Sequence, residues 1–256
     1  MGTYMSIWNG AVLLPEKAKG IPMKVWLRSI LGGLSLFVLA CEDNGTQVVP
    51  EVMVKAGANA YLALGDSYTI GEGVSESERW PMQLASGLRA QGLQVSDPQI
   101  IARTGWTTGD LAGAMDEARP KGPFALVTLL IGVNNQFRGY PREDYRMEFR
   151  SLLARAIVLA DGKPDRVAVL SIPDWGASFY AEGSDRLAIG ADIDAFNAIN
   201  LEETRAQGAR YVDVTGESRA AIGKREMFAA DGLHPSAKMY GEWVGLALTE
   251  LSRPGV

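Results

Sequence analysis

Short apolar runs alternate with longer amphipathic segments along most of the chain. Each run of roughly four to eight residues is rich in Leu, Ile, Val and Ala and is typical of a buried strand. The segments between these runs repeat their apolar positions every three or four residues, which is typical of helices that pack by one face. The expected strands are residues 60–64, 99–102, 124–131, 166–172 and 209–214. The expected helices are residues 80–91, 107–118, 143–160, 192–207 and 236–251.

This alternation predicts one α/β domain over residues 59–256. Strands separated by helices indicate βαβ units, whose right-handed crossovers place helices on both faces of a parallel sheet. We therefore expect a three-layer α/β/α fold with a five-stranded parallel sheet. Ligands of such sheets bind beyond the carboxyl ends of the strands, where the strand order reverses. The chemistry is therefore expected in the loops that follow the strands.

The first part of the chain differs from the rest in charge and hydropathy. Residues 1–40 carry four basic residues and one acidic residue, whereas the remainder carries 21 basic and 29 acidic residues. An uncharged, apolar run of 12 residues, 29–40, follows Lys24 and Arg28 and ends directly before Cys41. A bilayer span needs about 20 apolar residues, so this run is too short to cross one. Its length and basic flank are typical of a signal peptide.

The residues that end this run, Val38-Leu39-Ala40-Cys41, resemble the lipobox of bacterial lipoproteins. The resemblance implies cleavage before Cys41 and lipid attachment to its sulfur, which would hold the protein in the bacterial cell envelope through that lipid alone. We then expect translation to begin at Met23. Residues 1–22 would be a start-site extension, residues 23–40 a signal peptide and the polar residues 41–58 a linker. The alternative is a buried apolar helix with an incidental thiol.

The composition excludes several classes of protein. Hydrophobic residues make up 47% of the chain and charged residues 21%, which is ordinary for a globular domain. The net charge of −5 argues against a nucleic-acid partner, because such proteins usually present a basic field. The single Cys and single His rule out an intramolecular disulfide and a zinc site of nitrogen and sulfur ligands. The sequence GEG at 71–73 lacks the further Gly and the Lys of phosphate-binding loops.

Three loops at the expected strand ends carry residues suited to acyl transfer. Ser67 follows the first strand, and its hydroxyl is a candidate nucleophile or only part of a turn. Gly105 follows the second strand and lets a backbone N–H approach a ligand, or it is a simple turn residue. Asn134 follows the third strand and can direct its NH2 at developing negative charge, or it only bonds the loop backbone.

A fourth loop, ahead of the last helix, holds the only His of the chain. Asp231 lies three residues before His234, so its carboxylate can accept a hydrogen bond from Nδ1 and leave Nε2 free to take a proton. Pro235 restrains the backbone of His234 toward extended angles. The alternative is a structural His at a helix start, with Asp231 as a local cap.

In chain order these four blocks resemble the SGNH branch of the GDSL hydrolase family. The matching motifs are GDSYTIG, the Gly of RTGW, GVNN and DGLHP, and the resemblance extends over residues 61–251. It implies a flavodoxin-like three-layer fold and ester hydrolysis through an acyl-enzyme intermediate, a scheme that requires no metal or organic cofactor. Asn135 stands where many members have Asp, a departure that bears on the rigidity of its loop more than on activity.

The resemblance also implies a role for each matching residue. Ser67 would be the nucleophile, His234 the base and Asp231 the partner that orients the base. The backbone N–H groups of Ser67 and Gly105 and the side chain of Asn134 would form the oxyanion hole.

Aromatic residues near these loops are candidates for substrate binding, although such residues often only pack at the rim of a site. They are Tyr68, Trp106, Phe137, Trp175 and Phe179. The run Phe137-Arg138-Gly139 resembles a loop of lysophospholipase-like and thioesterase-like family members and favours an acyl ester as the small-molecule substrate. The alternatives are a carbohydrate O-acetyl esterase acting on a glycan ester, and a catalytically silent lipoprotein that binds glycan or lipid on the same fold.

Overall fold

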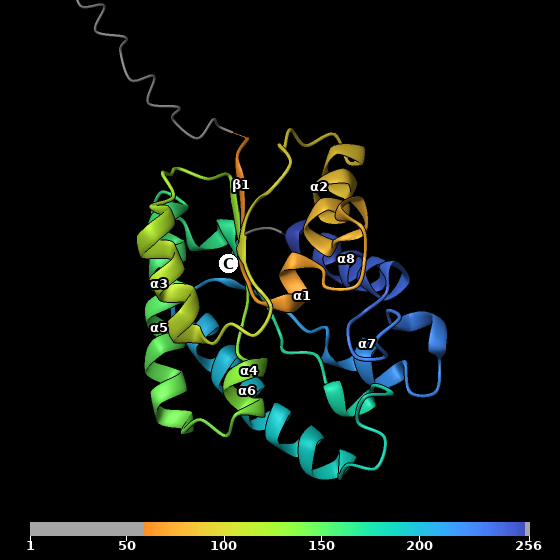
Figure 1. Cartoon of the computed structure of the whole chain (residues 1–256). Coiled ribbons are helices and arrows are strands. Elements are labelled where there is room, and N and C mark those ends of the chain that lie inside the picture. The colour runs from red at the N-terminus through yellow and green to blue at the C-terminus, as the bar shows by residue number, and fades with distance from the viewer. Residues whose placement is uncertain (1–58, 254–256) are drawn as a thin grey trace, which may run out of the picture. The chain divides into compact units, whose positions relative to one another are not determined.

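Five parallel strands form one sheet in the computed structural model, which describes residues 59–253 (Figure 1). The strands are β1 (Tyr61–Gly65), β2 (Gln99–Ala102), β3 (Leu126–Leu130), β4 (Val167–Leu170) and β5 (Arg210–Val212). Their spatial order is β2-β1-β3-β4-β5, and every neighbouring pair is parallel. This is the flavodoxin-like order, so the predicted five-stranded parallel sheet is confirmed.

Helices cover both faces of this sheet. They are α1 (Ser67–Ile70), α2 (Trp80–Ala90), α3 (Thr108–Ala118), α4 (Val133–Phe137), α5 (Arg142–Leu159), α6 (Arg186–Ala206), α7 (Thr215–Ala220) and α8 (Ala237–Leu251). Figure 1 shows α3 and α5 on one side of the strands and α2 and α8 on the other. The expected three layers are therefore present.

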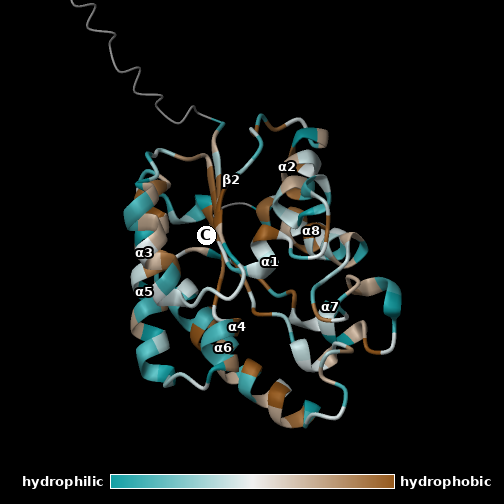
Figure 2. Cartoon of the chain, in the orientation of Figure 1, coloured by the Kyte–Doolittle hydropathy of each residue, from teal (hydrophilic) through white to brown (hydrophobic). Residues whose placement is uncertain are grey.

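The core lies where these layers meet. Every residue of β1, β3 and β4 is buried, which explains why their sequences are apolar almost without interruption. Figure 2 shows the strands as hydrophobic and the helices as mixed. The apolar face of α5 is buried as well, at Tyr145, Phe149, Leu152, Leu153 and Ala156.

Two features of the helices differ from the sequence prediction. Helix α6 begins at Arg186 rather than at residue 192, because the side chain of Asp185 accepts a hydrogen bond from the Ala188 N–H at 3.0 Å and caps the earlier turn. The short helices α1, α4 and α7 were not predicted as separate elements. Helices of so few residues contain too few apolar positions to show a period.

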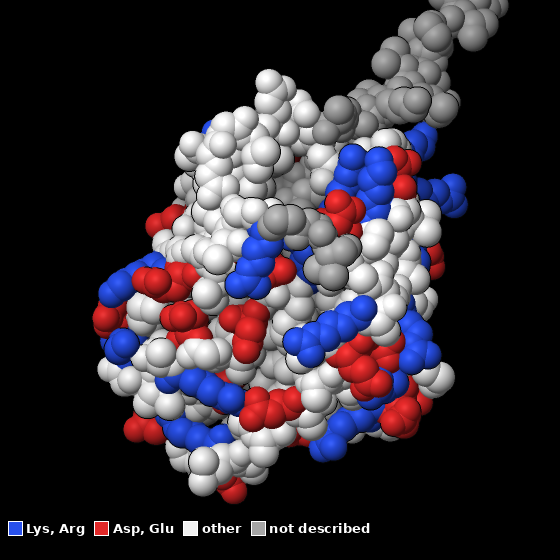
Figure 3. All heavy atoms as spheres, turned by 180° about the vertical axis from the view of Figure 1, so that it is seen from behind, with Lys and Arg blue, Asp and Glu red and all other residues white. Residues whose placement is uncertain are grey.

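The surface of this domain carries charges of both signs. On the face shown in Figure 3, basic and acidic side chains are interspersed rather than gathered in a patch of one sign. Among residues 59–253, no helix combines the length and the hydropathy that crossing a membrane requires. The expected start-site extension (1–22), signal peptide (23–40), lipidation site at Cys41 and linker (41–58) lie outside the described residues.

The strand order determines where a ligand site can form. The chain moves from β1 to its neighbour β2 on one side, and then returns to pair β3 on the other side of β1. The loops after β1 and β3 therefore leave the sheet at a point where the strand order reverses. Ser67 lies in the first of these loops and Asn134 in the second.

Candidate active site

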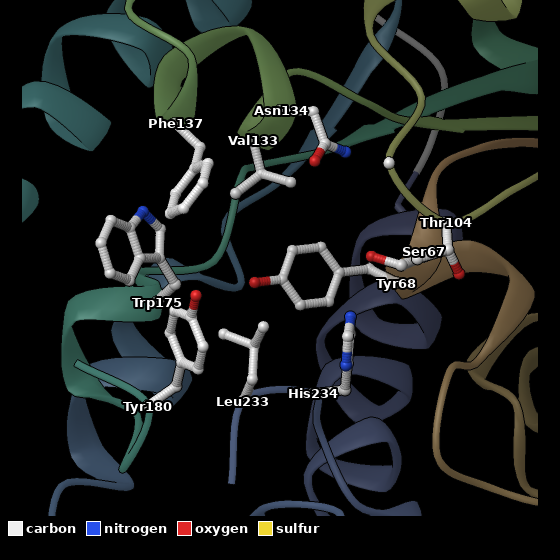
Figure 4. Close-up of a pocket in the computed structure, with 11 residues that line it drawn as sticks. Ser67, Tyr68, Thr104, Val133, Asn134, Phe137, Trp175, Tyr180, Leu233 and His234 are labelled. Atoms are coloured by element: carbon white, nitrogen blue, oxygen red, sulfur yellow. The ribbon is translucent and has the colours of Figure 1, made fainter. Parts of the chain in front are cut away.

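A cavity of about 180 Å³ lies at the carboxyl ends of the strands. It is lined by Ser67, Tyr68, Thr104, Gly105, Val133, Asn134, Phe137, Trp175, Tyr180, Leu233 and His234. All four loops predicted to carry the chemistry therefore contribute to one cavity, and Figure 4 shows their side chains converging there. In particular, Ser67 from the start of the domain and His234 from its last loop meet in the same place.

The turn that presents Ser67 is fixed by its two preceding residues. A Cβ at Gly65 would collide with the carbonyl oxygen of Leu130 and with Thr69, so this position requires glycine. Asp66 caps α1, because its Oδ1 accepts a hydrogen bond from the Tyr68 N–H at 3.1 Å. Ser67 is then the first residue of α1, and Figure 4 shows its hydroxyl directed into the cavity.

The carboxyl group of Asp66 is fully buried beneath this turn. Burial raises the pKa of Asp66 to about 7, although the hydrogen bond from the Tyr68 N–H opposes the rise. Its second oxygen, Oδ2, has no hydrogen-bond partner among the described residues. Asp66 therefore keeps its proton to a much higher pH than an ordinary aspartic acid.

His234 is held by Asp231 through a short hydrogen bond. The distance between His234 Nδ1 and Asp231 Oδ2 is 2.6 Å, and Asp231 Oδ1 accepts from the backbone N–H groups of Leu233 and His234. Burial alone would raise the pKa of Asp231, but the hydrogen bonds from the His234 ring and from the backbone lower it below its usual value. The carboxylate therefore stays charged, keeps the proton of the neutral ring on Nδ1 and leaves Nε2 as the basic nitrogen.

The free end of the His234 ring faces the Ser67 hydroxyl. Figure 4 shows one ring nitrogen pointing toward Ser67 and the other pointing away. Since Nδ1 binds Asp231, the nitrogen that faces Ser67 is Nε2. Within residues 59–253 no hydrogen bond joins the two side chains, and such contacts between a nucleophile and its base are often long until substrate binds.

The loop residues proposed for the oxyanion hole are also held in place. Asn134 donates one Nδ2 hydrogen to the carbonyl oxygen of Trp106 at 2.9 Å. Because an amide NH2 carries two hydrogens, the second is left for a ligand. Gly105 has a φ of 84°, which favours glycine, and its carbonyl oxygen accepts from Arg138 Nη2 at 2.7 Å. The loops after β2 and β3 are thus bonded to each other beside Ser67.

Asn135, the departure from the family pattern, has a clear structural role. It is fully buried, its Oδ1 accepts from the Thr108 N–H at 3.0 Å, and its Nδ2 donates to Thr108 Oγ1 at 2.7 Å. Thr108 Oγ1 in turn donates its hydrogen to Glu148. A charged Asp at position 135 would have no hydrogen to offer this hydroxyl, so the amide suits the surroundings and the loop remains firmly attached to α3.

A sequence model of the GDSL-like Lipase/Acylhydrolase family matches residues 63–241. The chain belongs to this family. As a GDSL acylhydrolase it is an enzyme that hydrolyses ester bonds, and the resemblance stated from its motifs is confirmed. No curated protein sequence gives a significant match.

Solved structures of other GDSL hydrolases have the same fold. TesA is 19% identical, with a TM-score of 0.60 over 76% of this chain and 98% of its own. The acetylxylan esterase Axe2 from Geobacillus stearothermophilus is 17% identical, with a TM-score of 0.58 over 79% and 98%. The lipase/acylhydrolase from Enterococcus faecalis is 21% identical, with a TM-score of 0.54 over 75% and 95%. At these identities the likeness establishes the architecture only.

Away from Ser67, the cavity of this GDSL hydrolase is aromatic. Tyr68, Phe137 and Trp175 line it as predicted. Trp106 does not line the cavity, and its side chain packs against the hydrophobic core. Phe179 also faces elsewhere, with its ring 5.6 Å from that of Phe228.

Four lining residues were not predicted from the sequence. They are Thr104, Val133, Tyr180 and Leu233. Each of them adjoins a residue that was predicted, so sequence adjacency was the available signal. Tyr180 follows Phe179 and lines the cavity in its place, because the ring of Phe179 packs against that of Phe228. Within residues 59–253, no three His, Cys, Asp or Glu side chains are grouped as metal ligands.

Proposed function

We propose that this GDSL hydrolase cleaves small carboxylic esters with an apolar acyl group through an acyl-enzyme on Ser67. The observation that carries the proposal is the single cavity that holds the Ser67 hydroxyl, the Asp231-bound ring of His234 and a largely apolar wall. A serine hydroxyl is a weak nucleophile and needs a base that faces it. The free ring end of His234 supplies that base.

The first half of the reaction forms the acyl-enzyme. His234 Nε2 takes the proton of Ser67 Oγ as Oγ bonds to the ester carbonyl carbon, and the carbonyl oxygen becomes an oxyanion. The second Nδ2 hydrogen of Asn134 and the backbone N–H groups of Ser67 and Gly105 stabilise that oxyanion. His234 then gives the proton to the alcohol oxygen, the carbon–oxygen bond to the alcohol breaks, and the alcohol leaves.

The second half releases the acid. A water molecule loses a proton to His234 Nε2 and attacks the acyl carbonyl carbon, and the oxyanion forms again in the same place. The intermediate collapses as the bond between the acyl carbon and Ser67 Oγ breaks, His234 returns the proton to Oγ, and the carboxylic acid leaves. Throughout, the charged Asp231 keeps the ring oriented and stabilises its protonated form.

The size and lining of the cavity support a small apolar acyl group. Sites for drug-sized ligands are usually about 300–1,000 Å³, whereas this cavity is about 180 Å³. Its walls away from Ser67 are formed by Val133, Trp175 and Leu233, which suit hydrocarbon rather than a charged group.

A carbohydrate O-acetyl esterase is the second candidate. The rings of Phe137 and Tyr180 are 54% and 56% exposed beside the cavity, and exposed rings of this kind can pack against the apolar face of a sugar. The acetylxylan esterase from Geobacillus stearothermophilus has the same fold. For such an esterase the acyl group is acetyl, and the two rings contact the sugar that forms the alcohol part of the ester.

For its location, we propose that a lipid on Cys41 holds the enzyme in the bacterial cell envelope, on the strength of the lipobox-like residues 38–41. A Cys41→Ser variant should then move from the detergent phase to the aqueous phase on extraction. If it partitions as the parent does, the anchor lies elsewhere.

Hydrolysis of a series of p-nitrophenyl esters from acetate to palmitate, together with acetylated xylan, tests the activity. We expect the highest kcat/KM with short acyl chains and a loss of hydrolysis in Ser67→Ala on the order of 10⁶-fold in kcat. Ser86→Ala, which removes an exposed hydroxyl on α2, is the matched control and should keep full activity. Equal hydrolysis by Ser67→Ala and the parent would contradict the proposal, and a preference for acetylated xylan would favour the second candidate.

A further inference from the structure

One indole ring closes the end of the cavity that lies farthest from Ser67. Trp175 lies in the 3-10 turn Trp175–Ala177 that follows β4, and Figure 4 shows its ring between those of Phe137 and Tyr180. The ring centroids are 5.3 Å from Phe137 and 6.3 Å from Tyr180. Phe137 and Tyr180 are more than half exposed, whereas Trp175 packs against the hydrophobic core. Trp175 is therefore the inner wall of the cavity, and the other two rings are its rim.

A chain of three hydrogen bonds, the first two of them partly buried, fixes this ring. Trp175 Nε1 donates to Gln136 Oε1 at 2.9 Å, and Gln136 Nε2 donates to Asp192 Oδ2 at 2.8 Å. Arg142 Nη2 donates to the other Asp192 oxygen at 3.0 Å. An indole can only donate and a carboxylate can only accept, so the Gln136 amide fits between them in one orientation.

Gln136 therefore has a defined effect on the position of Trp175. It is buried, and it lies in α4 two residues after Asn134. If the indole turned away, Gln136 Oε1 would be a buried acceptor without a donor. The hydrogen bond thus favours the one ring position that closes the cavity.

The course of the reaction indicates which part of the ester reaches this wall. From Ser67 to Trp175 the cavity follows the ring of Tyr68, whose hydroxyl points toward the aromatic end, with Val133 on one side and Leu233 on the other. The alcohol leaves in the first half of the reaction, whereas the acyl group stays bonded to Ser67 until water replaces it. An enclosed apolar end therefore suits the acyl group, and the alcohol suits the open side.

We propose that Trp175 determines specificity by limiting the length of the acyl chain, and that Gln136 is the positioning residue that holds it. This inference rests on the proposed esterase function. The ligand of the subsite is a short, unbranched hydrocarbon chain that ends against the indole.

Removing the wall should lengthen the chain that the enzyme accepts. The measurement is kcat/KM for p-nitrophenyl octanoate divided by kcat/KM for p-nitrophenyl acetate. We expect Trp175→Ala to raise this ratio about ten-fold or more, because even one methylene in an apolar pocket changes discrimination by that factor. Trp175→Leu, which retains a packed apolar side chain, should raise it less and serves if the alanine variant does not fold. Tyr140→Ala, an exposed aromatic residue next to α4 that does not line the cavity, is the control and should leave the ratio unchanged.

The role of Gln136 has its own readout. Gln136→Leu should raise the same ratio in the parent, because the indole loses its acceptor. In a Trp175→Phe background, where the ring has no N–H, Gln136→Leu should have no further effect on the ratio. An equal effect in both backgrounds would assign Gln136 a general structural role and overturn the positioning proposal.

A second ester series separates acyl from alcohol. With the acyl group fixed as acetate, the ratio of hexyl to ethyl ester hydrolysis should not change in Trp175→Ala. A change in this series instead of the acyl series, or in neither, would overturn the inference. If the parent hydrolyses acetate and Ser67→Ala does not, such a result rejects only the role of Trp175. If the parent hydrolyses no ester, the proposed function fails, and this inference fails with it.

Discussion

The two ends of the cavity are held together in different ways. At the end that contains Ser67, the side chains of His234 and Asn134 are each fixed by a hydrogen bond, to Asp231 and to the Trp106 carbonyl oxygen. At the aromatic end, the rim rings are more than half exposed, and one hydrogen bond, Trp175–Gln136, holds the inner wall. If the proposed roles are right, the fold fixes where the ester bond is attacked, while few contacts decide which ester fits.

Helix α4 serves both ends at once. Its second residue, Asn134, lines the cavity beside the proposed oxyanion site, and Gln136 and Phe137 face the aromatic end. The helix is in turn fixed by Asn135, which bonds Thr108 at the start of α3. A family-wide reaction and a chain-specific preference can thus be carried by adjacent residues of one short helix.

After the loss expected for Ser67→Ala, the largest effect is expected from the base. His234→Ala should lower kcat by about 10²–10⁴-fold, because Ser67 then loses its proton acceptor. If the catalytic and aromatic ends of the cavity act separately, the loss is the same for every ester. The ratio of kcat/KM for p-nitrophenyl octanoate to that for p-nitrophenyl acetate then stays at its parent value. Steady-state kinetics on both esters check this, and a loss confined to one chain length would show that the two ends are not independent.

A smaller but still large effect is expected from the oxyanion donor. Asn134→Ala should lower kcat by about 10²–10³-fold and leave KM nearly unchanged, because its free N–H acts on the charge that develops in the transition state. The fold should remain intact, which circular dichroism can verify. A rise in KM with kcat preserved would instead make Asn134 a substrate-binding residue.

The catalytic end also makes a prediction about stability and pH. Because the pKa of Asp66 is about 7 in the folded protein and 3.8 as the ordinary value, its stabilising contribution is complete below about pH 4 and is lost as the pH rises to about 7. This difference between the two pKa values corresponds to about 4 kcal/mol in the free energy of unfolding. Asp66→Asn cannot titrate, so its free energy of unfolding relative to that of the parent should rise over this interval. Urea unfolding at several pH values measures it, and a difference independent of pH would contradict the buried, protonated state of Asp66.

Much of the site could be predicted because its residues lie directly after buried strands. Ser67, Gly105 and Asn134 each follow a strand whose apolar run was evident, and parallel strands bring their carboxyl ends to one edge. The aromatic lining was harder to predict. Phe179 and Tyr180 are neighbours, and only the packing of Phe179 against Phe228 decides which of them reaches the cavity. The role of Gln136 depends on contacts with distant residues and has no local signal.

Elements of the fold were likewise predictable where the local sequence carries a clear signal. Long elements with a clear period, such as α5 and β3, were predicted close to their observed positions. The early start of α6 was missed because the cap at Asp185 precedes a segment whose apolar period is weak. Helices as short as α4 are specified by the loop contacts around them rather than by their own sequence.

Labelling with a fluorophosphonate tests the central claim most directly, because such a probe bonds only to a serine that a base has activated. The intact protein is treated near pH 8, digested and analysed by mass spectrometry. We expect one adduct, on Ser67, and little or none in His234→Ala under the same conditions. An adduct on another serine, or labelling of Ser67 that is equally fast without His234, would contradict the role of Ser67 as a nucleophile that His234 activates.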